Sequence, residues 1–464
     1  MKFIVQYTKF GCFILLMIAG QFFYSCKKFV DIKPPETQIE TSQIFEDDQS
    51  ATSAIAGLYK RLLTNNLLIC NAGMTVFPGL SADELVNTNA GTDDEFRTNN
   101  LSVTNGIVSG NLWQAAYKNI YHANAILEGL NNSTVNEALK KQIKGEALVV
   151  RALNYFYLVN LFGDVPLALT TSYEENQIMT RTPVTKVYDQ IVTDLSDAKN
   201  LLINSYPSSG RVRPNKFTAT ALLARVSLYL KNWVSAEAQS TEIINSGIYS
   251  LPSDIDKVFL ANSSETIWSL IQDKSNTAEG ASFIPAFSPS KPNYILTDTL
   301  LNSFEVNDQR KIKWVTNTSY NGTTFYYPYK YKKGDDYSSS PPPPTEYYIV
   351  FRLAEQYLIR AEARAQQGNI AGCQADINLI RNRSGLSNTI ASDKASLLSA
   401  VEHERQIELF AEWGHRWLDL RRTNRADQVL SAIKGASWQP TDVLYPVPQN
   451  QIQLNSFLTQ NAGY

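Results

Sequence analysis

The sequence predicts a mainly α-helical protein, and three observations support that class. Residues 145–162 form a segment of helix length that is apolar on nearly every side. Several other segments carry apolar residues at three- and four-residue steps, the spacing of one face of an α-helix. Two pairs of these segments are separated only by short polar turns, as in helical hairpins. With 464 residues, 44% of them hydrophobic, the chain can bury a large core.

The N-terminus has the layout of an export signal. Lys2 and Lys9 precede an apolar run at residues 10–20, which suits a signal sequence and is too short to span a bilayer comfortably. We therefore predict that residues 1–25 are a signal peptide, which is removed from the mature protein.

Cys26 follows a small residue, Ser25, in a sequence that resembles a bacterial lipoprotein cleavage box. We expect Cys26 to become the lipidated first residue of the mature chain, carrying palmitate or similar acyl groups. Two or three acyl chains attach a protein stably to a membrane, whereas one does not. Residues 26–40 include Pro34-Pro35 and are predicted to form a stiff tether. The alternative is a soluble secreted protein in which Cys26 is incidental.

The first part of the body alternates between helical and polar segments. Residues 45–59 and 113–130 have helical spacing. Residues 79–103 are polar and carry Phe96 as their only aromatic residue. We predict a long loop there, and loops of that length in compact domains are often functional.

The apolar segment at residues 145–162 must be buried among other helices. Gly163 can end this helix because glycine tolerates positive φ, and Pro166 prevents its continuation. Arg151 and Asn154 would then be buried as well. They need polar partners on neighbouring elements, because an unpaired buried polar group costs about 1–3 kcal/mol.

Further helices follow in close succession. Thr182 is placed to cap a helix with Pro183 in its first turn, and Asn215 to cap the next helix. These predicted helices occupy residues 184–202, 216–230, 233–245, 347–367 and 370–383. Their pairing resembles tetratricopeptide units, although an ordinary helical core accounts for the same residues. The proline-rich end, residues 445–464, should lie extended over the body.

Residues 404–422 carry many charges. On one continuous helix, Glu412 would pair with Arg416 and Arg405 with Glu408. Each pair would contribute about 0.2–0.5 kcal/mol if exposed. Such an array is either a catalytic cluster or a structural charge network, and the structural interpretation is favoured.

An aromatic-rich segment interrupts the helices. Asn321-Gly322 is a strong signal for a β-hairpin turn. Eight of the 24 residues at 314–337 are aromatic, against 11% of the whole chain. Such rings can stack on the apolar faces of sugars or on peptide side chains, but they are also good cross-strand pairs in a hairpin. Both interpretations stay open.

Seven stretches follow one another in an informative order: residues 26–31, 145–167, 210–251, 352–363, 379–386, 404–422 and 445–464. Together they resemble the SusD/RagB family of outer-membrane nutrient-binding lipoproteins of Bacteroidota. Length alone suggests about three domains. The resemblance instead implies one SusD-like body at residues 41–464, with four tetratricopeptide-like helix pairs. It also implies a variable, loop-rich part at about residues 251–348 with short β hairpins.

The resemblance further implies a function. Such a lipoprotein is exposed on the cell outer membrane, binds oligosaccharides and passes them to a TonB-dependent SusC-type transporter. Alternatives are a peptide-binding RagB-like member and a glycoside hydrolase, which needs only two suitably separated carboxylates. The shared motifs belong to the scaffold, so we take candidate ligand residues from loops and aromatic positions: Asp83, Phe96, Asn99, Trp268, Tyr294, Trp314 and Tyr327.

Most enzyme classes lack support in the sequence. It has no HExxH, CxxC, GxSxG, GxGxxG or P-loop motif. Its histidines are His122, His403 and His415. We expect a protein that is not an enzyme, with no catalytic residue, metal or cofactor. The 42 basic and 44 acidic residues are balanced, which argues against nucleic-acid binding. Beyond the export region only Cys70 and Cys373 remain, too few for a disulfide framework.

Overall fold

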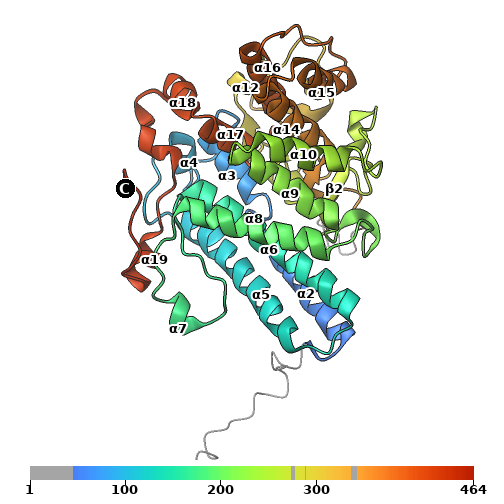
Figure 1. The fold of residues 1–464 in the computed structure, drawn as a ribbon. Coiled ribbons are helices and arrows are strands. Elements are labelled where there is room, and N and C mark those ends of the chain that lie inside the picture. The colour runs from blue at the N-terminus through green and yellow to red at the C-terminus, as the bar shows by residue number, and fades with distance from the viewer. Residues whose placement is uncertain (1–44, 273–276, 288, 336–341) are drawn as a thin grey trace, which may run out of the picture. The chain divides into compact units, whose positions relative to one another are not determined.

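The computed structural model describes residues 45–272, 277–287, 289–335 and 342–464. The predicted signal peptide, the lipidated Cys26 and the tether lie outside these residues. Helices dominate the described chain, as predicted, and its strands are short (Figure 1). Within the described residues, no helix combines the length and the apolar character needed to cross a bilayer.

The elements fall into a long series of helices with short strands between them. The α-helices are α2 (Asp48–Leu62), α3 (Gly73–Ser81), α4 (Asp94–Thr98), α5 (Ala115–Gly129), α6 (Glu137–Phe162), α7 (Tyr173–Asn176), α8 (Val184–Leu201), α9 (Lys216–Tyr229), α10 (Trp233–Ile244), α11 (Ala278–Phe283), α12 (Asp298–Ser303), α13 (Gln309–Trp314), α14 (Leu353–Gln366), α15 (Ile370–Arg383), α16 (Lys394–Glu408), α17 (His415–Arg422), α18 (Ala426–Lys434) and α19 (Gln449–Leu454). The strands are β1 (Leu85–Asn87), β2 (Thr266–Leu270), β3 (Tyr294–Leu296), β4 (Val315–Tyr320), β5 (Thr323–Pro328) and β6 (Tyr348–Arg352).

The described strands pair as separate two-stranded antiparallel sheets: β1 with β3, β2 with β6 and β4 with β5. The β4–β5 hairpin confirms the turn predicted at Asn321-Gly322. Asn321 has φ 49° and Gly322 has φ 78°, the positive values that a type I′ turn requires at both central residues.

The predicted central helix is α6, which packs against both α5 and α8. Gly163 ends it with φ 73°, as expected. Arg151 donates hydrogen bonds to Asp194 of α8 at 2.8 and 2.7 Å. The side-chain oxygen of Asn154 accepts a hydrogen bond from Asn119 of α5 at 3.0 Å. The expected polar partners are therefore present, and they link three helices.

The helices after α6 stack largely in chain order. α8 packs on α6, α9 on α8, α10 on α9 and α14 on α10, while α15 and α16 both contact α14 (Figure 1). The predicted helical hairpins are α9–α10 and α14–α15. Small residues at these helix contacts are fully buried: Ala224, Ala236, Ala361 and Ala365. Their size lets the helix backbones approach closely.

Three local predictions are wrong. Residues 347–352 do not begin a helix but include β6, because a short apolar run has no clear period. Residues 79–103 are not a single loop, since they contain β1 and α4. Thr182 does not cap α8: it forms a β-bridge, and the carboxylate of Asp164 accepts the N–H of Val184 at 2.8 Å.

The charged segment at 404–422 is also not one helix. Between α16 and α17 lies a turn in which Ala411 and Trp413 have φ values of 49° and 46°. The pairs predicted for a continuous helix do not form: Glu412 with Arg416 and Arg405 with Glu408.

The C-terminal end, expected to be extended, contains the short helix α19.

Many of these charges belong to a buried network between distant segments. Glu408 has no exposed surface. Its carboxylate accepts hydrogen bonds from Arg310 at 3.2 Å, from Arg352 at 2.6 Å and from Arg383. Arg352 also donates to Glu265 at 2.8 Å. Burial opposes ionisation of Glu408, but the surrounding arginines hold its pKa below the ordinary value.

Replacing Glu408 by Gln is expected to lower the free energy of unfolding by about 3 kcal/mol or more, because buried guanidinium groups lose a charged partner. Urea denaturation measures the loss. Because the pKa of Glu408 is lowered on folding, its stabilising contribution is present above the unfolded value of 4.5 and is lost as the pH falls through the folded value.

Asp189→Asn is the matched control for this prediction. It makes the same carboxylate-to-amide change in an ion pair with Lys186 whose side chains are 68% and 70% exposed. An exposed pair contributes at most about 1 kcal/mol. Equal losses in the two variants would show that the buried network is not a main source of stability.

Candidate functional site

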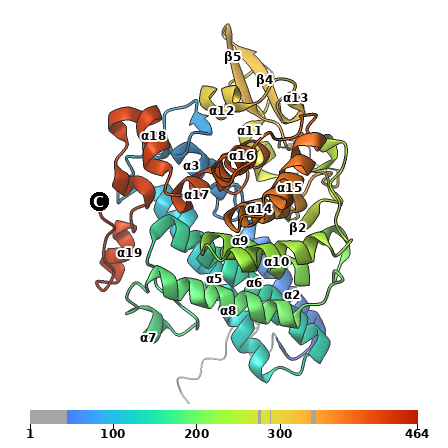
Figure 2. The same ribbon diagram turned by 45° about the horizontal axis from the view of Figure 1, so that its top comes forward.

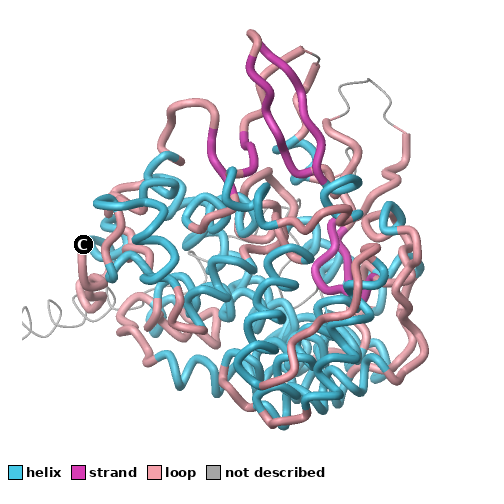
Figure 3. The backbone as a smooth tube through the Cα atoms, turned by 90° about the horizontal axis from the view of Figure 1, so that it is seen from above, coloured by secondary structure: helices cyan, strands magenta, loops and turns pink. Residues whose placement is uncertain are grey.

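Loops and short strands gather at one side of the helical stack. The β4–β5 hairpin projects there, with α12 and α13 near its base (Figure 2). In the view from above, the hairpin extends beyond its neighbours, and loops lie on either side of its base (Figure 3). Strand β3 packs against β5. We call the surface formed by residues 88–93, 289–293 and 315–328, together with Phe287, the loop face.

Polar side chains fix the first loop of this surface. The pairing of β1 with β3 sets Asn87 opposite Tyr294. The side-chain N–H of Asn87 donates to the backbone oxygen of Asn89 at 2.9 Å and to the carboxylate of Asp93 at 3.3 Å. Its side-chain oxygen is buried and has no hydrogen-bond partner among the described residues. One unsatisfied acceptor therefore lies at the base of the loop face.

The hairpin presents aromatic rings on both of its faces. Its register places Tyr320, Phe325 and Tyr327 on one face and Tyr326 on the other. Tyr320 is 39% exposed and Tyr326 is 43% exposed. In the loop before β3, Phe287 is 73% exposed. The loop face thus offers three accessible rings, and the two tyrosines lie on opposite faces of the hairpin.

The structure brings two of the predicted ligand residues together at the base of the loop face. Tyr294 and Tyr327 lie on the neighbouring strands β3 and β5, and each is 7% exposed. Tyr294 packs edge-on against Phe283 at 6.4 Å, and Tyr327 against Tyr329 at 6.3 Å. Burial raises the pKa of Tyr294, and the Asp93 carboxylate adds to the shift. Both tyrosines therefore support the exposed part of the surface.

Three further predicted residues form a buried group near α3. The carboxylate of Asp83 accepts two hydrogen bonds from Arg416, each of 2.8 Å. The side-chain oxygen of Asn99 accepts from Lys434, whose pKa burial lowers to about 7. Phe96 stacks on a ring of α3 at 4.9 Å. These contacts join the N-terminal part of the body to α17 and α18.

Trp268 and Trp314 lie in the core, and Trp314 directly precedes β4 at the base of the hairpin. Neither ring has exposed surface. Their indole N–H groups donate to the backbone oxygens of Val212 and Ile255, each at 3.2 Å. In this structure the two rings have packing partners and no free face. Ligand contact by the seven predicted residues stays a prediction.

Sequence reasoning did not single out Tyr320, Tyr326 or Phe287 as ligand residues. The usable signal for Tyr320 was its position directly before the Asn321-Gly322 turn, whereas Phe325, which is closer to that turn than Tyr326, is less exposed. Tyr320 lies at the exposed end of the hairpin, where few other segments cover its ring. No comparable signal marked Phe287.

Buried acids lie inside the body close to this surface. Burial raises the pKa of Glu279 to about 8 and that of Glu84 to about 8. Lys330, which lines a small cavity with Glu279, has its pKa lowered by burial to about 8. Across the described ranges, no three His, Cys, Asp or Glu side chains are placed to share a metal ion.

Sequence comparison identifies relatives along most of the chain. A family model described as "Starch-binding associating with outer membrane" matches residues 28–228, and a model of the SusD family matches residues 306–464. SusD-like protein P25 of Formosa agariphila is 27% identical over 95% of this chain and 97% of its own length. Starch-binding protein SusD of Bacteroides thetaiotaomicron is 34% identical over 25% of this chain and 21% of its own length.

Solved structures share the fold. A SusD superfamily protein from Parabacteroides distasonis superposes with a TM-score of 0.78 at 25% identity, covering 90% of this chain and 99% of that chain. A laminarin-binding SusD-like protein superposes with a TM-score of 0.77 at 24% identity, covering 90% of this chain and all of the other. The matched sequence segments and the shared helical architecture lead to one conclusion: the chain belongs to the SusD/RagB family, a glycan-binding family associated with the outer membrane whose members are binding proteins rather than enzymes.

Proposed function

We propose that this protein is a cell-surface lipoprotein that binds oligosaccharides at the loop face and passes them to a TonB-dependent SusC-type transporter. The observation that carries the proposal is the set of exposed rings on the loop face: Tyr320, Tyr326 and Phe287. Exposed amide side chains, Asn89 and Asn293, belong to the same surface. Aromatic rings cover the apolar faces of sugar rings, while polar neighbours orient the sugar hydroxyl groups.

The base of the loop face supports this role because it is firmly packed. Tyr294 and Tyr327 are almost fully buried where β3 meets β5. Tyr320 and Tyr326 therefore project from a hairpin whose base is packed against β3, while Phe287 lies in the loop before β3. A pre-ordered surface loses less conformational entropy on binding, which favours recognition of a flexible oligosaccharide.

Replacing Tyr320 or Tyr326 by Ala is expected to weaken oligosaccharide binding by about 2- to 10-fold each, because losing one ring contact costs about 0.5–1.5 kcal/mol. Isothermal titration calorimetry with laminarin and malto-oligosaccharides measures the change. These glycans are suitable probes because one structural relative binds laminarin and one sequence relative binds starch.

Tyr173→Ala is the matched control, since Tyr173 is 75% exposed but belongs to α7, outside the loop face. Its affinity for glycans should equal that of the unmodified protein. If the protein binds peptides from a panel and binds none of the glycans tested, the proposed ligand class is contradicted. Release of shorter sugars during incubation would show hydrolysis and contradict a purely binding role.

The proposed anchor depends on Cys26. In Cys26→Ser we expect no incorporation of labelled palmitate and a shift of the protein from the outer-membrane fraction to the soluble fraction, because the acyl chains provide the attachment. Glycan binding by the purified variant should be unchanged. Affinity purification of the acylated protein from membranes should recover a TonB-dependent barrel, and purification without any such barrel would contradict the transporter partnership.

A further inference from the structure

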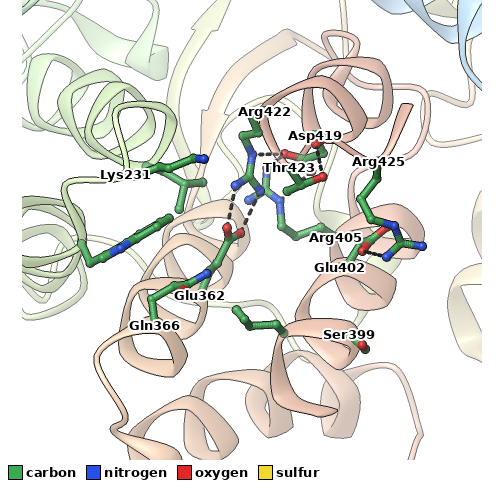
Figure 4. Close-up of a pocket in the computed structure, with 13 residues that line it drawn as sticks. Lys231, Glu362, Gln366, Ser399, Glu402, Arg405, Asp419, Arg422, Thr423 and Arg425 are labelled. Carbon is green, nitrogen blue, oxygen red and sulfur yellow. Dashed lines mark hydrogen bonds and ion pairs between the residues drawn. The ribbon is translucent and has the colours of Figure 1, made fainter. Parts of the chain in front are cut away.

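A cavity of about 420 Å³ lies in the helical stack and is bordered by α10, α14, α16 and α17 (Figure 4). Its wall holds ion pairs. Glu362 accepts hydrogen bonds from Arg422 at 2.6 and 2.7 Å. Asp419 accepts from Arg422 and from Arg405, each at 2.7 Å. Because these charged groups are paired with one another, the cavity belongs to the scaffold.

On the surface, two segments that are distant in the sequence expose large apolar side chains where they meet. Ile178 follows α7 and is 58% exposed. Leu454 ends α19 and Phe457 follows it, and they are 80% and 56% exposed. The side-chain amide of Asn455 donates a hydrogen bond to the backbone oxygen of Met179 at 2.8 Å, which joins the two segments. We call Ile178, Leu454 and Phe457 the apolar patch.

Hydrogen bonds from one arginine hold both segments in place. Arg181 donates to the backbone oxygens of Asp164 at 2.7 Å and Phe162 at 3.0 Å, at the C-terminal end of α6. It also donates to the backbone oxygen of Thr459 at 3.0 Å, just after α19. The side chains of the apolar patch therefore project from backbone that is tied to the helical body.

The chain around the apolar patch carries few charges. Residues 443–464 contain no Asp, Glu, Lys or Arg, although such residues make up 19% of the whole chain. In residues 167–180 the charged residues are Glu174 and Glu175, and both are exposed. Exposed apolar surface of this kind marks a contact with a protein or a membrane. The two carboxylates would repel an anionic surface, so a partner without net charge fits better.

The described chain begins near the same loop. Phe45 packs so closely on Gly129, at the end of α5, that a Cβ atom at position 129 would lie 2.2 Å from its ring. The neighbouring Glu128 accepts the backbone N–H of Thr171 at 2.8 Å, in the loop that leads to α7. The chain that leads from Cys26 therefore enters the body beside this loop, and it reaches at most about 65 Å.

The small size of the apolar patch favours a membrane over a protein partner. A stable protein–protein interface takes about 20–30 residues on each side. The apolar patch offers three side chains, with Tyr173 of α7 nearby in the sequence at 75% exposure. Such a surface binds weakly by itself. A lipid anchor on the same chain raises the effective concentration of the membrane to the millimolar range, so that a weak contact suffices.

We propose that the apolar patch is a second membrane contact, which inserts Ile178, Leu454 and Phe457 among zwitterionic lipid headgroups of the membrane that holds the acyl chains of Cys26. The choice of a membrane as the partner rests on the proposed acylation of Cys26. Burial of apolar side chains away from water drives the insertion. In Figure 2, α7 lies at the far end of the body from the β4–β5 hairpin, so this contact leaves the loop face open to glycans.

Cosedimentation of the purified mature Cys26→Ser protein with phosphatidylcholine vesicles tests the patch without acyl chains. We expect the bound fraction to rise with lipid in the millimolar range. Replacing both Leu454 and Phe457 by Ser should weaken this binding by at least about tenfold, because two large apolar side chains no longer leave water. No binding, or equal binding by the double variant, would overturn the proposal. Binding that requires added phosphatidylglycerol would identify an electrostatic contact and would also overturn it.

Ile390→Ser, in the same Cys26→Ser background, is the matched control. Ile390 is 98% exposed and lies between α15 and α16, outside the apolar patch. Its replacement should leave vesicle binding unchanged, and an equal loss would show unspecific adhesion and overturn the proposal. Thermal unfolding midpoints close to that of the parent protein would show that the variants remain folded.

A fluorescent label reads the contact in the acylated protein. Leu454→Cys can be labelled selectively, because Cys70 and Cys373 are buried. In phosphatidylcholine vesicles, the emission of an environment-sensitive label should shift to shorter wavelength at residue 454 but not at Ile390→Cys. A shift that appears only when a TonB-dependent barrel is added would identify a protein interface and overturn the proposal. Failure of palmitate labelling would contradict the proposed anchor, whereas failure of Cys26→Ser to bind vesicles would contradict the patch.

Discussion

The burial of arginine side chains against carboxylates from distant segments is the constraint on which the rest of the structure depends. Glu408 on α16 meets arginines from α13, β6 and α15, and Arg352 also reaches Glu265 just before β2. Each of these charges would be costly inside the protein without its partners. The partners are satisfied only when the loop-rich segment is correctly placed on the helical stack. The network therefore makes the position of the loops depend on the fold of the helices.

This dependence has a functional consequence. The helices and the buried charges form a firm base, and the tyrosines at the root of the loop face extend that packing into the strands. On the loop face, the rings of Tyr320, Tyr326 and Phe287 remain accessible. Substitutions in the base should act through stability, whereas substitutions of outer rings should act through affinity. The residues that support the loop face are thus distinct from those that we propose to contact the ligand.

The loop face and the charged cavity differ in the chemistry that they offer. The loop face has accessible rings and amides, which suits neutral sugars that keep part of their hydration. The cavity between α10, α14, α16 and α17 is lined by carboxylates and guanidinium groups that are paired with one another. Arg405 and Arg422 both donate hydrogen bonds to Asp419 in its wall, so these groups are part of the scaffold.

The sequence by itself determined most of the helices, the central position of α6, the Asn321-Gly322 hairpin and the family resemblance. These features depend on local information: apolar residues at helical steps, residues that tolerate positive φ, and motifs in a fixed order. The sequence showed that Arg151 and Asn154 need polar partners, but it did not identify those partners. Tertiary structure alone decided that residues 347–352 enter a strand and that the segment 404–422 breaks at Ala411 and Trp413.

The candidate site shows the same division more sharply. The sequence located the aromatic-rich segment but could not separate the buried Trp314 from the exposed Tyr326. It paired Glu412 with Arg416 along a helix, whereas the folded chain pairs Glu412 with Lys330 and Arg352. Exposure and long-range charge pairing depend on which distant segments meet, and neighbouring residues in the sequence carry little of that information. Packing of the whole chain therefore decided which rings and which charges remain available to a ligand.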